Sequence, residues 1–176
     1  MKKILVLSGS PRKGGNSDIL CDQFIKGAEE SGHLATKIYL KDCKIASCNA
    51  CYACKKNGIC VQNDDMTDIL QQMIDADIIV LATPVYFYSM NGQMKTMIDR
   101  TLARYTEIRD KDFYFIATAA AGKSSMERTI DSLSGFTDCL PMSHVKGVIY
   151  GAGAWQLGDI QGNKAMQEAY KTGKNA

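Results

Sequence analysis

Short apolar runs and helical patterns alternate along this chain from its first residues to its last. The inner apolar runs are unbroken, as in strands of a parallel sheet that are buried on both faces. The runs predict five strands, at Lys3–Leu7, Thr36–Leu40, Ile78–Thr83, Phe113–Thr118 and Val145–Gly151. The patterns between them predict helices over 17–31, 66–75, 91–105 and 124–137, and a last helix over about 161–172.

Strands that alternate with helices predict parallel pairing through right-handed crossovers. We therefore expect the α/β class, with a doubly wound five-stranded parallel sheet in the order 2-1-3-4-5 and helices on both faces. In this order the ligand site is expected at the carboxyl edge of the sheet, among the loops after strands one, three and four. The 176 residues suffice for one domain and are too few for two ordinary ones, so we expect a single domain over 1–176.

Charge and composition disfavour several classes of function. Lys and Arg number 21 and Asp and Glu 19, which gives no electrostatic reason to expect nucleic acid or an anionic membrane as a partner. No apolar stretch reaches the roughly 18 residues of a membrane-spanning helix, and the run Ile4–Leu7 is too short for the core of a signal peptide. We expect a cytoplasmic protein, whose seven cysteines are thiols or metal ligands.

The loop after the first strand contains residues that favour an anion. Residues 8–17 read S-G-S-P-R-K-G-G-N-S, with hydroxyls, an amide, a guanidinium and two glycines at the start of a predicted helix. Backbone N–H groups, the helix dipole and an arginine favour a terminal phosphate there. The dinucleotide fingerprint is broken at Pro11 and the lysine of a P-loop is missing, so a mononucleotide fits best. A plain turn with a helix cap is the alternative.

The loop after the third strand is aromatic. Residues 83–92 read T-P-V-Y-F-Y-S-M-N-G, with three consecutive aromatic side chains. A flat isoalloxazine ring needs apolar or aromatic walls and backbone hydrogen-bond donors, and this loop offers both. The alternative is that these aromatic residues cover a sheet edge or an oligomer surface.

Four of the seven cysteines fall within thirteen residues of an otherwise patternless loop over 42–64; they are Cys48, Cys51, Cys54 and Cys60. So long a loop without regular structure is unusual in a compact domain unless it is functional. The spacing suits a [4Fe–4S] cluster, whereas a structural zinc usually takes two separated cysteine pairs. A cluster, empty thiols and zinc all stay open.

Two sets of charged residues are expected to have structural roles. Asp64 and Asp65 precede the helix predicted at 66–75 and are expected to cap it. Lys95, Asp99 and Arg100 are expected to form a solvated or intersubunit charge patch.

The loop at 8–17, followed by T-P-V-Y-F-Y-S-M-N-G-Q-M-K-T-M-I-D-R at 83–100, resembles the NAD(P)H-dependent FMN reductases of flavodoxin-like fold, and the cysteine run resembles that of the iron–sulfur flavoproteins. The resemblance implies bound FMN. Its phosphate would lie on Ser10, Arg12, Gly15, Asn16 and Ser17. Its ring would lie beside Pro84, Val85, Tyr86 and Phe87, with Ala119, Ala120 and Gly122 on the far side. NAD(P)H as electron donor and a homodimer or homotetramer are also implied.

We therefore expect an FMN-dependent NAD(P)H oxidoreductase that passes electrons to a small molecule or a redox protein, with a [4Fe–4S] cluster as a second carrier if the cysteines hold one. The flavin supplies the chemistry, so no catalytic acid, base or nucleophile is required of the side chains. A non-enzymatic flavodoxin-like electron carrier is one alternative, which the nearly neutral charge disfavours. A zinc-stabilised interaction module is another.

Overall fold

Five parallel strands form the sheet in the computed structural model, which describes residues 1–176. Their order is β2-β1-β3-β5-β6, so the predicted strands and the predicted strand order are both confirmed. The strands are β1 Lys3–Ser8, β2 Leu34–Tyr39, β3 Ile78–Tyr86, β5 Asp112–Ala119 and β6 His144–Ala152. A two-residue strand that the sequence did not predict, β4 Ser89–Met90, pairs antiparallel with the end of β3.

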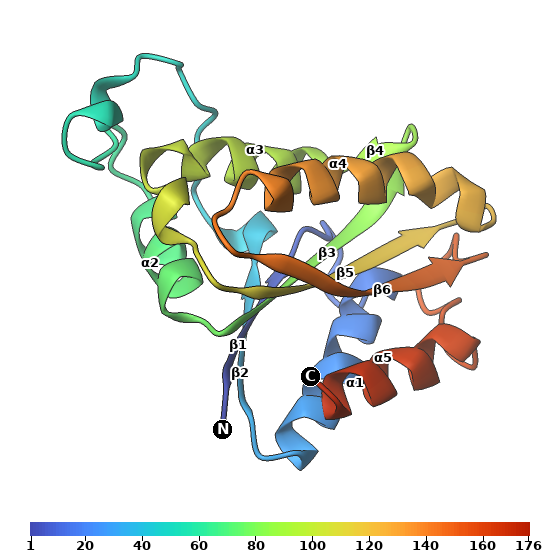
Figure 1. Ribbon diagram of the computed structural model, residues 1–176. Helices are drawn as coiled ribbons and strands as arrows, with labels where there is room; N and C mark the ends of the chain where they lie inside the picture. Colours follow the sequence, from blue (N-terminus) through green and yellow to red (C-terminus); the bar gives the residue numbers. More distant parts are fainter.

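Helices cover both faces of the sheet (Figure 1). Helices α1 Asn16–Glu30 and α5 Lys164–Lys174 cover one face. The other face is covered by α2 Met66–Asp75, α3 Gly92–Arg100 and α4 Glu127–Asp138. The helix predicted over 91–105 ends at Arg100 and is followed by short 3₁₀ turns, and the last helix starts three residues later than predicted.

The sheet divides the core into two layers. Along β1, Ile4 and Val6 pack toward α1 and α5, whereas Leu5 and Leu7 pack toward α2 and α3. Successive side chains of a strand point to opposite faces, so a strand covered on both sides must be apolar throughout. Burial of each such side chain contributes about 1.5–3 kcal/mol, which explains why the unbroken runs located the strands correctly.

Helices α1 and α5 touch through two glycines. A Cβ atom on Gly27 would overlap the carbonyl oxygen of Tyr170, and one on Gly173 would overlap that of Phe24. Only glycine lets the two backbones approach this closely. The contact fixes α5 against α1, the helix that begins at the end of the loop over 8–17.

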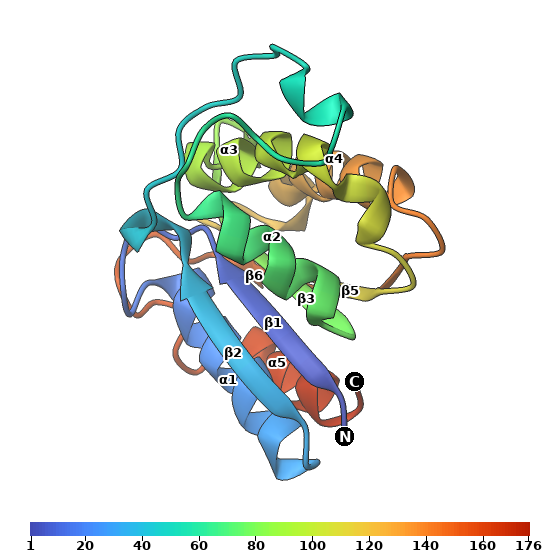
Figure 2. The ribbon, with the colours of Figure 1, turned by 90° about the vertical axis from the view of Figure 1, so that its left-hand side faces the viewer.

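The segment 43–64 projects beyond the layer of α2 and α3 (Figure 2). Its only helical element is the 3₁₀ turn Ala53–Lys55, in agreement with the predicted lack of regular structure. No helix of the protein combines the length and the apolar character needed to cross a membrane.

Candidate flavin site

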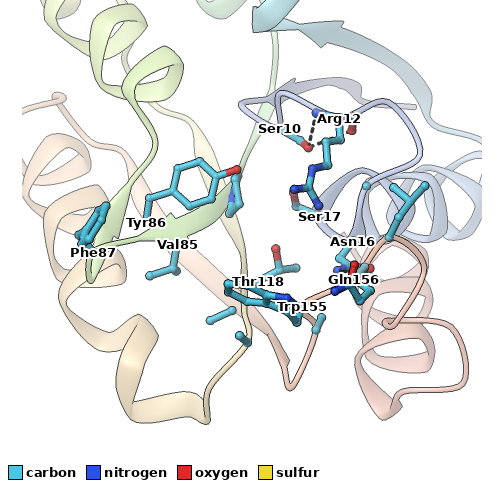
Figure 3. Close-up of a pocket in the computed structure, with 16 residues that line it drawn as sticks. Ser10, Arg12, Asn16, Ser17, Val85, Tyr86, Phe87, Thr118, Trp155 and Gln156 are labelled. Atoms are coloured by element: carbon cyan, nitrogen blue, oxygen red, sulfur yellow. Dashed lines mark hydrogen bonds between the residues drawn. The ribbon is translucent and has the colours of Figure 1, made fainter.

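A cavity of about 630 Å³ opens at the carboxyl edge of the sheet. Its lining comes from the loops after β1, β3 and β5, as predicted, and also from the loop after β6 (Figure 3). The volume falls within the range of small-molecule sites, about 300–1,000 Å³.

The structure brings nearly all the predicted flavin residues together. Those that line the cavity are Ser10, Arg12, Gly15, Asn16, Ser17, Pro84, Val85, Tyr86, Phe87, Ala119 and Ala120. Gly122 is absent from the lining, because it has turned away to precede the 3₁₀ turn Lys123–Met126, where its carbonyl accepts a hydrogen bond from the Ser125 hydroxyl. What each lining residue binds stays a prediction.

The loop after β1 forms a tight turn that is held by local hydrogen bonds. The Ser10 hydroxyl donates to the Arg12 carbonyl over 2.9 Å and accepts from the Arg12 N–H over 3.1 Å. The Gly15 N–H bonds the same carbonyl at 3.0 Å. A Cβ on Gly15 would lie 2.8 Å from that oxygen, so the loop requires glycine at this position.

The end of this loop carries unneutralised positive charge. Helix α1 begins at Asn16 with Gly15 as its N-cap, and no side chain caps it, so the first-turn N–H groups are available to a ligand. Arg12 is exposed and takes part in none of the ion pairs of the protein. N–H groups at a helix start together with a free guanidinium are suited to an anion.

A buried acid in the same turn is turned away from the cavity. Asp18 is 2% exposed, accepts the Gly14 N–H at 2.8 Å and pairs with Lys37 at 2.7 Å. The lysine offsets the negative charge that Asp18 would otherwise place beside an anion. Sequence reasoning missed this pair, because Lys37 lies on β2 and the contact joins two elements.

The aromatic loop forms a tight hairpin opposite the loop over 8–17. Tyr86 pairs with Ser89, and the two residues between them, Phe87 and Tyr88, have left-handed φ angles of 51° and 62°. Phe87 is fully exposed at its edge of the cavity. Figure 3 shows Val85, Tyr86 and Phe87 across the cavity from Arg12. The cavity therefore has a polar, positive side and an apolar side.

Asn91 fixes these two loops to each other. It is 1% exposed; its amide donates to the Gly9 carbonyl, and its backbone N–H donates to the Thr83 hydroxyl at 3.1 Å. It also caps α3, accepting from Met94 N–H at 3.4 Å. The sequence placed Asn91 at the start of a helix, but gave no signal for its link to Gly9, 82 residues away.

Sequence reasoning missed part of the cavity wall. The unpredicted lining residues are Thr118, Ala154, Trp155, Gln156 and Leu157. Four of them follow β6, whose carboxyl end reaches the same edge of the sheet. The only tryptophan of the chain, four residues after the last predicted strand, was the signal that could have found this segment.

The predicted metal ligands are not assembled in the structure. Cys48 and Cys51 are exposed, Cys54 and Cys60 are partly buried, and all are free thiols. No group of three or more His, Cys, Asp or Glu side chains is placed to hold a metal ion. This geometry therefore does not fit a cluster or a zinc ion, and the ligand set remains a sequence prediction.

Arg100 is buried under the cysteine loop, so the prediction that it belongs to a solvated or intersubunit charge patch with Lys95 and Asp99 was wrong. Its side chain is 1% exposed and donates from Nη1 and Nη2 to the two oxygens of Asp64, at 2.6 and 2.9 Å. Nη1 also donates to the Ala46 carbonyl at 2.7 Å, and Nη2 lies 3.6 Å from the Cys60 sulfur. Lys95 and Asp99 form the expected exposed pair.

Asp64 is held in its ionised form by these contacts. Burial opposes ionisation, but hydrogen bonds from Arg100 and from the N–H groups of Ala46 and Met66 keep the pKa of Asp64 below its ordinary value. Asp64 thus accepts the N–H of Met66, the first residue of α2. The N-cap residue itself is Asp65, whose side chain makes no capping hydrogen bond and accepts the Lys44 N–H at 2.6 Å instead, so the prediction that Asp65 caps α2 was wrong.

Residues 2–156 match the family model described as NADPH-dependent FMN reductase. The chain belongs to this family. Membership confirms the predicted FMN-dependent oxidoreductase, its FMN cofactor and its use of NAD(P)H. The flavodoxin-like α/β fold is confirmed by the strand order and by similar solved structures.

Curated relatives agree with membership of the NADPH-dependent FMN reductase family, and a solved structure agrees with the fold. An iron-sulfur flavoprotein of Archaeoglobus fulgidus is 34% identical over 175 residues, which cover 96% of this chain and 86% of that protein. Another from the same organism is 41% identical over 102 residues, 58% of this chain and 46% of that protein, so this match spans less than half the relative. The structure of an FMN-dependent NADH-azoreductase from Bacillus anthracis in complex with FMN superposes with a TM-score of 0.75 at 16% identity, covering 99% of each chain.

Proposed function

We propose that the cavity at the carboxyl edge binds FMN and that NAD(P)H reduces the bound flavin there. The observation that carries this proposal is the placement of an uncapped helix start with a free arginine across one cavity from a wall of aromatic residues. FMN has the matching polarity, with a phosphate at one end and a flat heterocycle at the other. The FMN complex of the azoreductase with a similar fold supports it.

The phosphate is assigned to the loop after β1. Arg12 supplies charge, Ser10 and Ser17 supply hydroxyls, and Gly15 allows the backbone to approach. The N–H groups of the first turn of α1 complete the set. A phosphate there would be the nearest partner for the Arg12 guanidinium, which no acid of the protein neutralises.

The ring is assigned to the space between the β3–β4 hairpin and the end of β5. Pro84, Val85 and Tyr86 supply one wall, and Ala119 and Ala120 leave room on the other because their side chains are small. These apolar side chains give the flat ring surfaces that it can pack against. The exposed Phe87 lies where a second planar molecule, such as nicotinamide, would approach.

The flavin, when bound, supplies the chemistry by taking up two electrons from NAD(P)H and passing them on. The residues of this chain bind and orient it: Arg12 and the helix start anchor one end, and the hairpin places the other end at the open mouth. No side chain of the cavity is required as an acid, base or nucleophile. The acceptor is proposed to be a small molecule or a redox protein.

The cysteine loop is proposed to bind a [4Fe–4S] cluster through Cys48, Cys51, Cys54 and Cys60. Support comes from the donor chemistry, four thiols at suitable spacing, and from relatives that are named iron-sulfur flavoproteins. The present placement of the sulfur atoms does not support it. Metal ligands often assemble only with the metal, so the loop would have to rearrange.

We also propose a cytoplasmic homodimer or homotetramer. Tyr86, Phe87, Tyr88 and Trp155 are all more than 45% exposed around the cavity mouth, and exposed aromatic side chains are enriched in interfaces. All seven cysteines are free, as expected in a reducing compartment. Sedimentation equilibrium of the flavin-loaded protein measures the subunit number, and a monomer would contradict the oligomer.

An anaerobic titration tests the proposed function. The protein is loaded with FMN, freed of excess, and titrated with NADPH and separately with NADH while the flavin absorbance is recorded. Bleaching by about one equivalent of either donor is expected from two-electron reduction. Arg12→Ala serves as the site variant and should bind FMN more weakly than the wild type. A protein that takes up no FMN, or whose bound FMN neither donor bleaches, would refute the proposal.

A further inference from the structure

Trp155 lines the cavity, and none of the flavin contacts proposed so far involves it. It is the only tryptophan of the chain, it lines the cavity, and its side chain is 72% exposed. Figure 3 places it beside Thr118, between Tyr86 and Phe87 on one side and the loop that carries Arg12 on the other. A large flat side chain exposed inside a cavity has surface available to contact a ligand.

The segment that carries Trp155 is fastened at its start to the end of β5. The N–H of Ala154 donates to the Ala119 carbonyl at 2.9 Å, and that of Gly153 to the Ala121 carbonyl at 3.2 Å. Within the segment, one oxygen of Asp159 accepts the N–H groups of Trp155 at 2.9 Å and Gln156 at 2.6 Å. The carboxylate thus fixes the backbone of Trp155 itself.

The other end of the segment is fastened by Asn16. The Asn16 side-chain oxygen accepts the N–H groups of Gly158 at 3.1 Å and Ile160 at 3.3 Å, and its NH₂ donates to the Gln156 carbonyl at 2.8 Å. An amide oxygen has two lone pairs and an NH₂ has two hydrogens. Both lone pairs and one hydrogen of Asn16 are therefore engaged by a segment 140 or more residues away in sequence.

We propose that Asn16 and Asp159 are positioning residues that hold Trp155 as a wall against the riboflavin part of FMN. The inference rests on the proposed function, because it assumes that FMN occupies this cavity. It assigns the main role of Asn16 to the segment 156–160 instead of the phosphate that the sequence suggested. Trp155 is the residue that touches the cofactor, and Asn16 and Asp159 act through it.

Comparison of FMN with riboflavin separates the two roles of Asn16. The ligands differ only in the phosphate, and their affinities are measured by quenching of flavin fluorescence. Asn16→Ala should weaken the binding of both by a similar factor, about tenfold for lost hydrogen bonds, so that their ratio is unchanged. Arg12→Ala should weaken FMN alone. A loss for Asn16→Ala confined to FMN would make Asn16 a phosphate ligand and overturn the inference.

The emission of Trp155 provides a second measurement, without any ligand. Because the chain has one tryptophan, its emission anisotropy reports the mobility of this segment alone. Asn16→Ala and Asp159→Asn should both lower the anisotropy of the flavin-free protein. Their controls, Asn63→Ala and Asp131→Asn, change exposed residues of other elements and should leave it unchanged. Unchanged anisotropy in both positioning variants would refute the positioning role.

Trp155→Ala tests the contact without risk to the fold, since the side chain is mostly exposed. It should weaken FMN and riboflavin by equal factors, and Trp155→Phe should restore most of the affinity. Wild-type affinity in Trp155→Ala would overturn the inference while leaving the proposed function intact. A wild-type protein that binds neither flavin would overturn both.

Discussion

The guanidinium of Arg100 and the carboxylate of Asp64 form a two-point ion pair beneath the cysteine loop, with N–O distances of 2.6 and 2.9 Å. The pair joins Arg100, the last residue of α3, to Asp64, which lies two residues before the start of α2. Because Arg100 also bonds the Ala46 carbonyl, it closes the base of the whole loop from 46 to 64. The position of Cys60 near Nη2 follows from this closure.

Loss of the carboxylate should destabilise the fold. Asp64→Ala leaves the buried charge of Arg100 unpaired, which costs about 3 kcal/mol in the free energy of unfolding. Urea denaturation measures it. Asp68→Ala, an exposed acid in the first turn of α2, is the matched control and should change stability by less than about 0.5 kcal/mol. Equal effects of the two variants would show that the ion pair does not stabilise the fold.

The same pair predicts how stability depends on pH. The pKa of Asp64 is lowered in the folded protein, so the folded state binds this proton less readily than the unfolded state does. Its contribution is present above the ordinary carboxyl pKa, about 4, and is lost as the pH falls through the lower folded value. Asp64→Asn should therefore lose less stability than the wild type between pH 5 and 2.5. The measurement is urea denaturation across that range, and parallel pH profiles would contradict the assignment.

The contact of α1 with α5 should not tolerate a methyl group. Gly27→Ala would overlap the Tyr170 carbonyl and should destabilise the protein by about 1–3 kcal/mol, as overpacking does. Gly135→Ala in α4 is the control, because no atom lies within 4 Å of its Cβ position and alanine favours a helix by about 0.5–1 kcal/mol. Thermal melting measures the effect. The midpoint temperature should fall in Gly27→Ala and should not fall in Gly135→Ala. Two melting curves that shift alike would rule out close packing as the cause.

Phe87 is expected to destabilise the β3–β4 hairpin, because its backbone conformation is unfavourable for a phenylalanine. Phe87 has a left-handed φ and is fully exposed, whereas asparagine adopts this conformation at lower cost. Phe87→Asn should raise the free energy of unfolding by about 0.5–1 kcal/mol and slow reduction by NAD(P)H. Denaturation and stopped-flow reduction measure the two effects. Reduction at the wild-type rate would exclude Phe87 from nicotinamide binding.

Iron analysis tests the cysteine loop. Anaerobic reconstitution with iron and sulfide should give about four irons per chain, as in a [4Fe–4S] cluster. Cys60→Ala should lose the iron and retain FMN, because Cys60 does not line the flavin cavity. Cys139→Ala, an exposed cysteine on another element, should keep both. If the wild-type chain binds no iron, the proposal that the four cysteines hold a [4Fe–4S] cluster is refuted.

Local patterns predicted most of the cavity correctly. The loops at 8–17 and 83–92 each follow a strand whose apolar run is easily recognised, and parallel strands bring such loops to one edge. The prediction failed where a residue's partner is distant in sequence. Arg100 looked solvated beside Lys95 and Asp99, because nothing in its local pattern reveals Asp64 or the loop that buries it.

Local patterns were enough to predict the strands, their order and the loops after β1, β3 and β5 at the ligand edge, because burial on both faces and turn chemistry depend on neighbouring residues. Three features depend instead on how the elements pack: the loop after β6 completes the cavity, Asn16 bonds that loop, and Arg100 closes the base of the cysteine loop. These contacts join residues 36 to 144 positions apart. Their partners are set by how the elements pack, since the hydrogen bonds form only after the sheet has brought both groups to the same place.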